Sequence, residues 1–258
     1  GILGKIDKDF LMRRDFGEAG GGLANTPENL RKWGGRPLRT EHTTPKMFAP
    51  GVVPGLGVTS IGGSVFLIEI LLGHHQTRKV KLTGIRASSD SKDTVNKIDE
   101  SLQLAFGILA TEQGMLFSKV KELEKENGPL YVQGHLTDGA VPKDGPSAGV
   151  AIMLALYGAL TRQSVKPVED IPLLAATGEI TLSGAVTAVG GIRDKILAAH
   201  RFGVRLVLIP KENENDVEEI PEEVKKAMRI ETVETVIEAL AIAYPDDEKI
   251  KALRQGSN

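Results

Sequence analysis

The segment Val150–Leu160 constrains the fold most, because it is apolar on every face of the helix that it would form. It is too short to cross a bilayer, which takes roughly 20 apolar residues. A helix without a polar face has to be buried in a protein core. We therefore predict a central buried helix here. The other long apolar run, Val65–Leu72, is interrupted by Glu69 and is also predicted to be core.

Predicted strands and helices alternate along the rest of the chain. Strands are predicted at Ser64–Leu72, Lys79–Ile85, Leu130–Leu136, Leu173–Ala176 and Leu206–Ile209, and the first two are expected to pair with each other. Amphipathic helices are predicted through Val95–Leu109, Gly191–Phe202 and Val233–Tyr244, where apolar residues recur every three or four positions. Acidic Glu212–Glu223 is predicted to form a surface turn and helix. The fold class is therefore α+β, with mixed strands and helices around one core.

The first fifty residues differ from the rest in composition. Gly20–Gly22, Gly34–Gly35 and three prolines are typical of a connector with little structure of its own. We predict that residues 1–50 are a linker and the remnant of a preceding module, that 51–245 form the compact domain, and that 246–258 are a C-terminal tail. The chain begins with Gly1 and shows no signal-peptide pattern, so we expect an excised or processed piece of a longer protein.

Composition excludes several classes of function. A formal net charge of −2 over 258 residues provides no electrostatic attraction for nucleic acid or an anionic membrane. The absence of cysteine removes disulfides, thiolate nucleophiles and zinc–thiolate sites. No phosphate-binding loop of the G-x-x-x-x-G-K-[ST] type and no H-E-x-x-H motif occurs. We therefore expect neither a cofactor nor a metal in this chain.

Ser147 stands where a turn-rich segment meets the central helix. The segment reads Pro142-Lys143-Asp144-Gly145-Pro146-Ser147-Ala148-Gly149. A serine at this point lies beside unpaired backbone N–H groups at the positive end of the helix dipole, and these groups could also hold an oxyanion. For a serine at a helix start taken alone, capping by Ser147 or Asp144 is the commoner role. The density of turn residues before Ser147 is what favours a nucleophile.

A serine nucleophile needs a base, and Lys195 is the candidate. None of the 5 histidines stands in a triad motif. On the predicted helix, Lys195 shares the apolar stripe of Ile192, Ala199 and Phe202. Periodicity alone favours a snorkelling lysine, whose stem is packed and whose ammonium reaches water. A catalytic lysine would instead be buried and have a lowered pKa.

Two separated segments resemble the Lon protease family. The segment around Ser147 is similar to the signature of the catalytic serine in that family. The segments Thr177–Gly184 and Val189–Lys195 resemble the part that holds the catalytic lysine. The resemblance runs from about Pro50 to Tyr244 and includes Leu208–Asn213. It implies the fold of the Lon proteolytic domain, which is ribosomal protein S5 domain 2-like.

The resemblance also implies a role for each matching residue. Ser147 would attack the scissile carbonyl and Lys195 would accept its proton. Thr177 matches a threonine near the lysine amine, where its hydroxyl could orient the base. Asp144, Glu179 and His135 match other positions that line the site, although Asp144 could be only a helix cap and His135 only a strand residue.

Other expectations concern partners. Family members form six-membered rings and degrade unfolded or damaged proteins delivered by an ATP-driven AAA+ module on the same polypeptide. Residues Asn25–Pro37 look like the tail of that module, so ATP and Mg are expected on a part absent from this chain. The expected compartment is the bacterial cytoplasm or the mitochondrial matrix, with no membrane or nucleic-acid partner.

The chain departs from the family pattern at several positions. Gln133 stands where many members have a second histidine, and Val58 replaces a tryptophan. The segments Gly84–Lys97 and Arg162–Ile171 are longer than usual. These differences concern substrate preference more than chemistry. Two alternatives stay open, a catalytically silent binding or regulatory domain on the same scaffold and a hydrolase that acts on small molecules.

Overall fold

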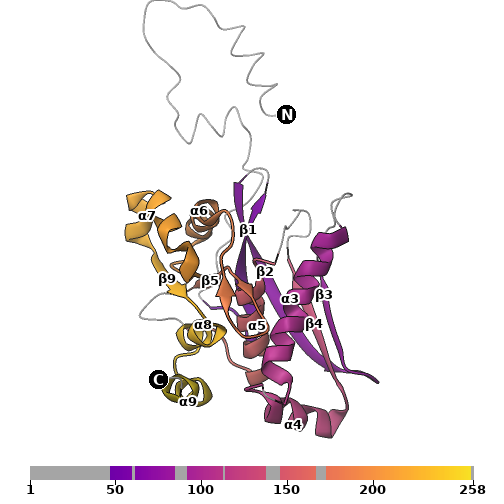
Figure 1. Ribbon diagram of the computed structural model, residues 1–258. Helices are drawn as coiled ribbons and strands as arrows, with labels where there is room; N and C mark the ends of the chain where they lie inside the picture. Colours follow the sequence, from indigo (N-terminus) through magenta and orange to yellow (C-terminus); the bar gives the residue numbers. More distant parts are fainter. Residues whose placement is uncertain are drawn as a thin grey trace, which may run out of the picture. The chain divides into compact units, whose positions relative to one another are not determined.

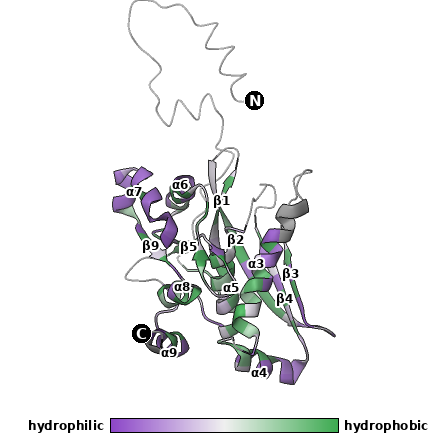
Figure 2. Ribbon diagram, in the orientation of Figure 1, coloured by the Kyte–Doolittle hydropathy of each residue, from purple (hydrophilic) through white to green (hydrophobic). Residues whose placement is uncertain are grey.

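The central element of the fold is helix α5, Gly149–Thr161, which the apolar segment forms as predicted. The computed structural model describes residues 47–59, 62–84, 92–112, 114–137, 146–166 and 173–256. Val150 to Tyr157 are all buried. Helix α5 packs between two strands of the sheet, β1 (Val52–Thr59) and β2 (Gly62–His74), and two helices, α3 (Lys92–Ala110) and α8 (Val236–Ala243). Figure 2 shows that hydrophobic residues gather on α5 and that α4 (Phe117–Asn127) and α7 (Glu222–Ala227) are mostly hydrophilic.

A seven-stranded mixed sheet carries the helices, in the order β3-β4-β2-β1-β5-β8-β9 (Figure 1). Its strands are β1 Val52–Thr59, β2 Gly62–His74, β3 Lys79–Thr83, β4 Leu130–Leu136, β5 Leu174–Ala176, β8 Leu206–Pro210 and β9 Arg229–Val233. A separate hairpin consists of β6 Glu179–Ile180 and β7 Val186–Thr187. The helices besides α5 are α3 Lys92–Ala110, α4 Phe117–Asn127, α6 Ile192–Phe202, η1 Lys211–Glu219, α7 Glu222–Ala227, α8 Val236–Ala243 and α9 Glu248–Gly256. This architecture confirms the predicted mixed α/β class.

The two faces of the sheet are covered by different helices. Alternate residues of a strand point to opposite faces. Ala176 and Leu208 belong to the core cluster that contains α5, α3 and α8, whereas Ala175 and Val207 belong to the cluster that contains α6 and α7. Helix α5, which follows Ser147, and helix α6, which carries Lys195, therefore lie on opposite faces of the sheet.

The expected pairing of the first two predicted strands is wrong. Strand β4 lies between them, antiparallel to β2 with Ile70 opposite Gly134, and parallel to β3 with Val80 opposite Val132. Leu130, Val132 and Leu136 of β4 are buried, so this strand occupies an interior position where both of its edges are paired. The alternation of a strand specifies which face is buried but carries no information about its neighbour.

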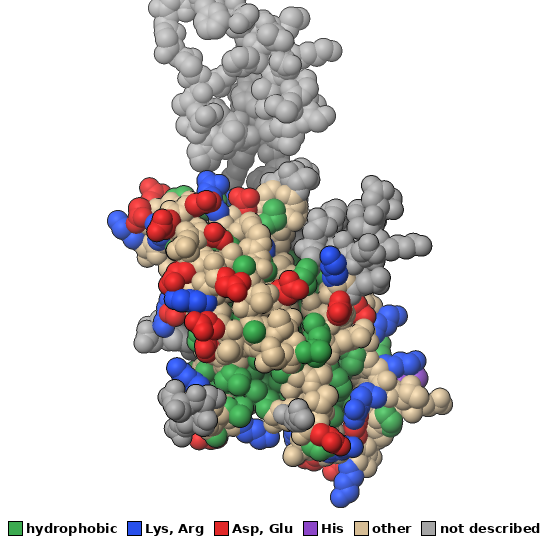
Figure 3. Space-filling model, viewed as in Figure 1, with side chains coloured by type: hydrophobic (Ala, Val, Ile, Leu, Met, Phe, Trp, Pro, Cys, Tyr) green, Lys and Arg blue, Asp and Glu red, His purple; other side chains and the backbone are tan. Residues whose placement is uncertain are grey.

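The last third of the chain also differs from the expectation. Val233 ends strand β9, which was not predicted, and the helix begins only at Val236. Thr235 caps it by accepting a hydrogen bond from the N–H of Glu238 at 3.2 Å. Within residues 246–258, expected to be a tail, the chain forms α9, whose Ile250 is buried. The acidic segment Glu212–Glu223 is confirmed as surface, and Figure 3 shows Asp and Glu side chains gathered over this region.

Gly63 sets how closely α6 approaches the sheet. It pairs with Val58 near the end of β1, and a Cβ atom there would overlap the carbonyl oxygen of Asp194 on α6. We expect Gly63→Ala to lower the free energy of unfolding by about 1–3 kcal/mol, because overpacking forces backbone shifts. Gly107→Ala in α3 is the matched control, since its Cβ would meet nothing within 4 Å; it should stabilise by roughly 0.5–1 kcal/mol. Equal urea midpoints for Gly63→Ala and the wild type would contradict this packing.

Candidate active site

Ser147 is fastened by its backbone to the segment that follows β5. Its carbonyl oxygen accepts hydrogen bonds from the Thr177 hydroxyl at 3.1 Å and from the N–H of Gly178 at 2.9 Å. The carbonyl of Gly178 accepts in return from the N–H of Val150 at 3.1 Å. Gly149 permits this approach, because a Cβ atom there would lie 3.0 Å from the backbone nitrogen of Ile180. The start of α5 is therefore held against residues 177–180.

The Ser147 side chain does not act as the helix cap. The capping position is occupied by Ala148, which has no polar side chain. Ser147 is half-buried, and its hydroxyl has no hydrogen bond to another residue that the structure describes. The capping alternative for Asp144 falls outside the described residues. The hydroxyl of Ser147 is thus available at the N-terminal end of a buried helix.

Lys195 is buried on the sheet-facing side of α6. Its side chain is 2% exposed, and Ile192 and Ala199 on the same stripe are 2% and 0% exposed. Snorkelling, the interpretation that periodicity alone favoured, is therefore wrong. Burial away from water lowers the pKa of the Lys195 amine from 10.5 to about 8, because desolvation disfavours the charged form. A substantial fraction of this amine is neutral near pH 8.

Both residues belong to the same edge of the sheet. Strands β1 and β5 are parallel, with Gly55 opposite Ala176, so Thr177 and the attached Ser147 lie at the carboxyl end of β5, level with the middle of β1. The start of α6 lies further towards the carboxyl end of β1, because Gly191 packs on Val58. In open α/β sheets this edge is where ligand sites form. The structure brings the elements that carry Ser147 and Lys195 to it from opposite faces.

The predicted supporting residues are distributed differently. Thr177 is completely buried and contacts Ser147 through the hydrogen bond described above. Glu179 starts β6, two residues further along, and is half-buried. Asp144 lies outside the described residues. The structure therefore places two of the four, Thr177 and Glu179, in the segment that holds Ser147.

His135 is not placed at this edge. It pairs with Glu69, which pairs with Val52 at the start of β1. Thr177 is level with about Leu56 of β1, so His135 is displaced from it by roughly 13 Å along the strands and by three strand positions across the sheet. The ring is exposed, with Nδ1 3.0 Å from the Thr83 hydroxyl. Sequence similarity identified His135, but strand register separates it from the carboxyl edge.

Two residues of this region were missed by the sequence analysis. Gly178 donates its N–H to the Ser147 carbonyl, and its φ of 151° is open to glycine. Asn213 is buried, with 6% exposure, and its side chain contacts the segment before α6. A polar residue in an acidic surface segment carries no pattern that predicts burial. Of these two residues, only Gly178 carried a sequence signal, because a glycine directly after Thr177 is typical of a backbone conformation that other residues rarely adopt.

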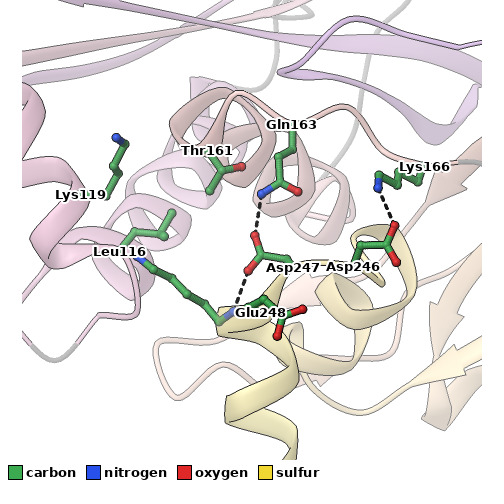
Figure 4. A pocket seen from close by; sticks show the side chains of 9 residues that line it. Leu116, Lys119, Thr161, Gln163, Lys166, Asp246, Asp247 and Glu248 are labelled. Atoms are coloured by element: carbon green, nitrogen blue, oxygen red, sulfur yellow. Dashed lines mark hydrogen bonds and ion pairs between the residues drawn. The ribbon is translucent and has the colours of Figure 1, made fainter.

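A pocket lies at the opposite end of α5 (Figure 4). It is lined by Leu116, Lys119, Thr161, Gln163, Lys166, Asp246, Asp247, Glu248 and Lys249. Thr161 ends α5, so the pocket is about 20 Å along the helix from Ser147. Lys166 is paired with Asp246, and the Gln163 amide donates to Asp247 at 2.6 Å. These two contacts join the segment after α5 to the residues just before α9.

The described part of the chain contains neither a cluster of metal-binding side chains nor a membrane-spanning helix. No group of three or more His, Cys, Asp or Glu side chains lies close enough together there to hold a metal ion. Among the same residues, none of the helices has the length and apolar character that crossing a membrane requires.

The fold and the site define a mixed α/β domain with a candidate serine nucleophile and a buried lysine at the carboxyl edge of its sheet. The model of the Lon protease C-terminal proteolytic domain matches residues 25–246. This chain belongs to that family. The match starts before residue 51, where the compact domain was predicted to begin, and the domain boundaries stay a prediction.

Several Lon proteases are similar over nearly the whole chain. That of Methanosarcina barkeri is 34% identical over 246 residues, which cover 95% of this chain and 27% of that protein. That of Nitrosococcus oceani is 38% identical over 248 residues, with 95% and 29% covered. That of Vibrio parahaemolyticus is 39% identical over 246 residues, again with 95% and 29% covered. This chain therefore spans less than a third of the length of these relatives.

Proposed function

We propose that this chain is the proteolytic domain of an ATP-dependent serine peptidase, with Ser147 as nucleophile and Lys195 as general base. The observation that carries the proposal is Lys195, a lysine that is 2% exposed on the helix that starts near the carboxyl end of β1. A neutral amine is the form able to accept a proton from a serine hydroxyl. A silent binding domain, the alternative, has no requirement for a buried lysine with a lowered pKa.

The proposed reaction uses groups at the carboxyl edge of the sheet. The Ser147 hydroxyl attacks the scissile carbonyl while Lys195 takes its proton. The N–H groups of Ser147 and Ala148, which have no hydrogen bond among the described residues, are the candidate donors to the oxyanion. Lys195 then protonates the departing amine, and finally takes a proton from the water that hydrolyses the acyl-enzyme. Thr177 holds the Ser147 backbone throughout.

The proposed biological substrate is unfolded or damaged polypeptide. Two observations support this. The relatives are named Lon proteases, and more than two thirds of each of them lies outside the matched region. We infer that the remainder of the protein supplies an AAA+ module that binds ATP and Mg and delivers the substrate. Assembly into a six-membered ring and a location in the bacterial cytoplasm or mitochondrial matrix belong to the same proposal.

The pH dependence of peptide cleavage tests the base. The pKa of Lys195 is lowered to about 8, so the amine is charged and inactive below that pH and neutral above it. We expect kcat/KM for a fluorogenic peptide to rise with pH, with a single apparent pKa close to this value. A midpoint near 6.5, the ordinary value of histidine, would contradict the assignment.

Cleavage of casein tests the substrate class. A peptidase cuts this unfolded protein, whether or not it also hydrolyses small carboxylic esters. Hydrolysis of the esters without any cleavage of casein or peptides would instead support a hydrolase of small molecules. A high protein concentration should be used, because it favours assembly.

A further inference from the structure

Asn213 makes a two-point contact with the backbone immediately before α6. Its Oδ1 atom accepts a hydrogen bond from the N–H of Val189 at 2.9 Å, and its Nδ2 atom donates to the carbonyl of Val189 at 3.0 Å. The same Nδ2 atom donates to Asp216 at 2.7 Å. The side-chain amide thus pairs with Val189 as a neighbouring strand would. A buried amide with these bonds is oriented in one way only.

The contact is made next to the point where α6 begins. Val189 is two residues before Gly191, whose φ of 71° turns the chain into the helix. The carbonyl of Gly191 accepts the N–H of Lys195 at 3.0 Å, in the first turn of the helix. The segment has a second anchor, because the Glu212 carboxylate accepts the N–H of Ala188 at 2.8 Å. The start of α6 is therefore fixed by two consecutive residues of η1.

Fixing the start of α6 also fixes how deeply Lys195 is buried under this helix. Helix α6 packs between the sheet and η1, and at Gly63 it touches the sheet with no space for a Cβ atom. The contact at Gly63 holds the side of α6 that faces the sheet. A shift at Val189, on the other side, therefore has to move the first turn of α6. Misplacement of a catalytic group by about 1 Å can reduce a rate on the order of 10²-fold.

We propose that Asn213 is a positioning residue. It holds the 188–191 segment and thereby places the Lys195 amine in the buried position required to activate Ser147. The inference rests on the proposed roles of Ser147 and Lys195. Asn213 itself touches neither the Ser147 side chain nor a substrate. Its substitution should therefore reduce kcat and leave KM within about 2-fold, since substrate contacts are unchanged.

The experiment measures activation of Ser147 directly. A fluorophosphonate reagent reacts with an activated serine: a phosphorus–oxygen bond forms at Ser147, fluoride leaves, and the base takes the proton. Its rate constant is measured by mass spectrometry over a range of pH for the wild type and the variants, with kcat and KM for a fluorogenic peptide. For Asn213→Ala we expect about a 10- to 100-fold fall in the labelling rate and in kcat.

Matched variants separate positioning from loss of folding. Asn215→Ala is the control, because Asn215 is exposed on η1 and its side chain has no hydrogen bond among the described residues; it should behave as the wild type. Glu212 is also exposed, so Glu212→Ala should stay folded and lose only the Ala188 anchor, with a several-fold fall. Glu212→Gln retains an acceptor oxygen and should lose little. Thermal unfolding is recorded for each variant.

A double variant tests the contact itself. In Asn213→Asp with Asp216→Asn, the new carboxylate can still accept from Val189, and the new amide can donate to that carboxylate. We expect its labelling rate to lie above that of Asn213→Ala. A purely structural role would move the unfolding temperature and leave the labelling rate of the folded fraction, with its pH dependence, unchanged.

The outcomes distinguish this inference from the function on which it rests. Labelling of Asn213→Ala at the rate of Asn215→Ala would overturn the positioning role alone, provided that the wild type is labelled at Ser147. No labelling of Ser147 in the wild type, or undiminished labelling in Lys195→Met, would overturn the proposed function and this inference with it.

Discussion

Ser147→Ala is expected to reduce peptide hydrolysis by about 10⁴-fold or more, because no other group can form the acyl-enzyme. The fold should be unaffected. The hydrogen bonds at this position involve the Ser147 carbonyl, which accepts from Thr177 and Gly178, and alanine retains that carbonyl. The free energy of unfolding should therefore stay within about 0.5 kcal/mol of the wild type. Fluorogenic-peptide kinetics and urea unfolding measure the two effects.

Ser118→Ala is the matched control for this variant. Ser118 is exposed on α4 and stands three residues before Lys121, a spacing that imitates a serine–lysine motif. It should retain full activity. Substantial peptide hydrolysis in Ser147→Ala, with the protein folded, would rule out the proposed nucleophile.

Lys195→Met is expected to lose catalysis and to gain stability at neutral pH. Methionine fills a similar volume without a charge to desolvate. The pKa of Lys195 is about 8 in the folded protein and 10.5 in the unfolded chain, so protonation favours unfolding. At pH 7 the buried amine costs about 3 kcal/mol of folding free energy by linkage. Peptide hydrolysis should fall by about 10³-fold or more, as for other groups that activate a nucleophile.

The pH dependence identifies the origin of this stability gain. The advantage of Lys195→Met over the wild type should be constant below pH 8, shrink as the pH rises towards 10.5, and vanish above it. Lys226→Met on the exposed surface of α7 is the control and should give no such gain. A wild type as stable as Lys195→Met at pH 7 would show that the lysine is not buried in solution. The expected trade of stability for function is common at active sites.

Most helices and several of the core strands were predictable because their patterns are local. The helix of Val150–Leu160, the strand Leu130–Leu136 and the helix of Gly191–Phe202 agree with α5, β4 and α6 within a residue or two. Strands β1, β6, β7 and β9 were not predicted. β6 and β7 are two residues long, too short for an alternating pattern to be recognised.

The candidate site was predictable as a set of residues but not as an arrangement. Ser147 and Lys195 were selected by turn chemistry and by a lysine on an apolar stripe, and the family resemblance named them together. The same resemblance also named His135, which strand register places elsewhere. Asn213 was not singled out for any role, because its importance comes from a contact with Val189, 24 residues away in the chain.

Sequence alone therefore determined which segments are helical, which are buried, and which residue types could act as nucleophile and base. These properties depend on neighbours within one or two turns of chain, so they leave a periodic signal. Tertiary structure decided that β4 separates β2 from β3, that α5 and α6 cover opposite faces of the sheet, and that Lys195 is buried rather than snorkelling. Each of these depends on contacts between segments far apart in the chain, where packing and desolvation, rather than local periodicity, set the free energy.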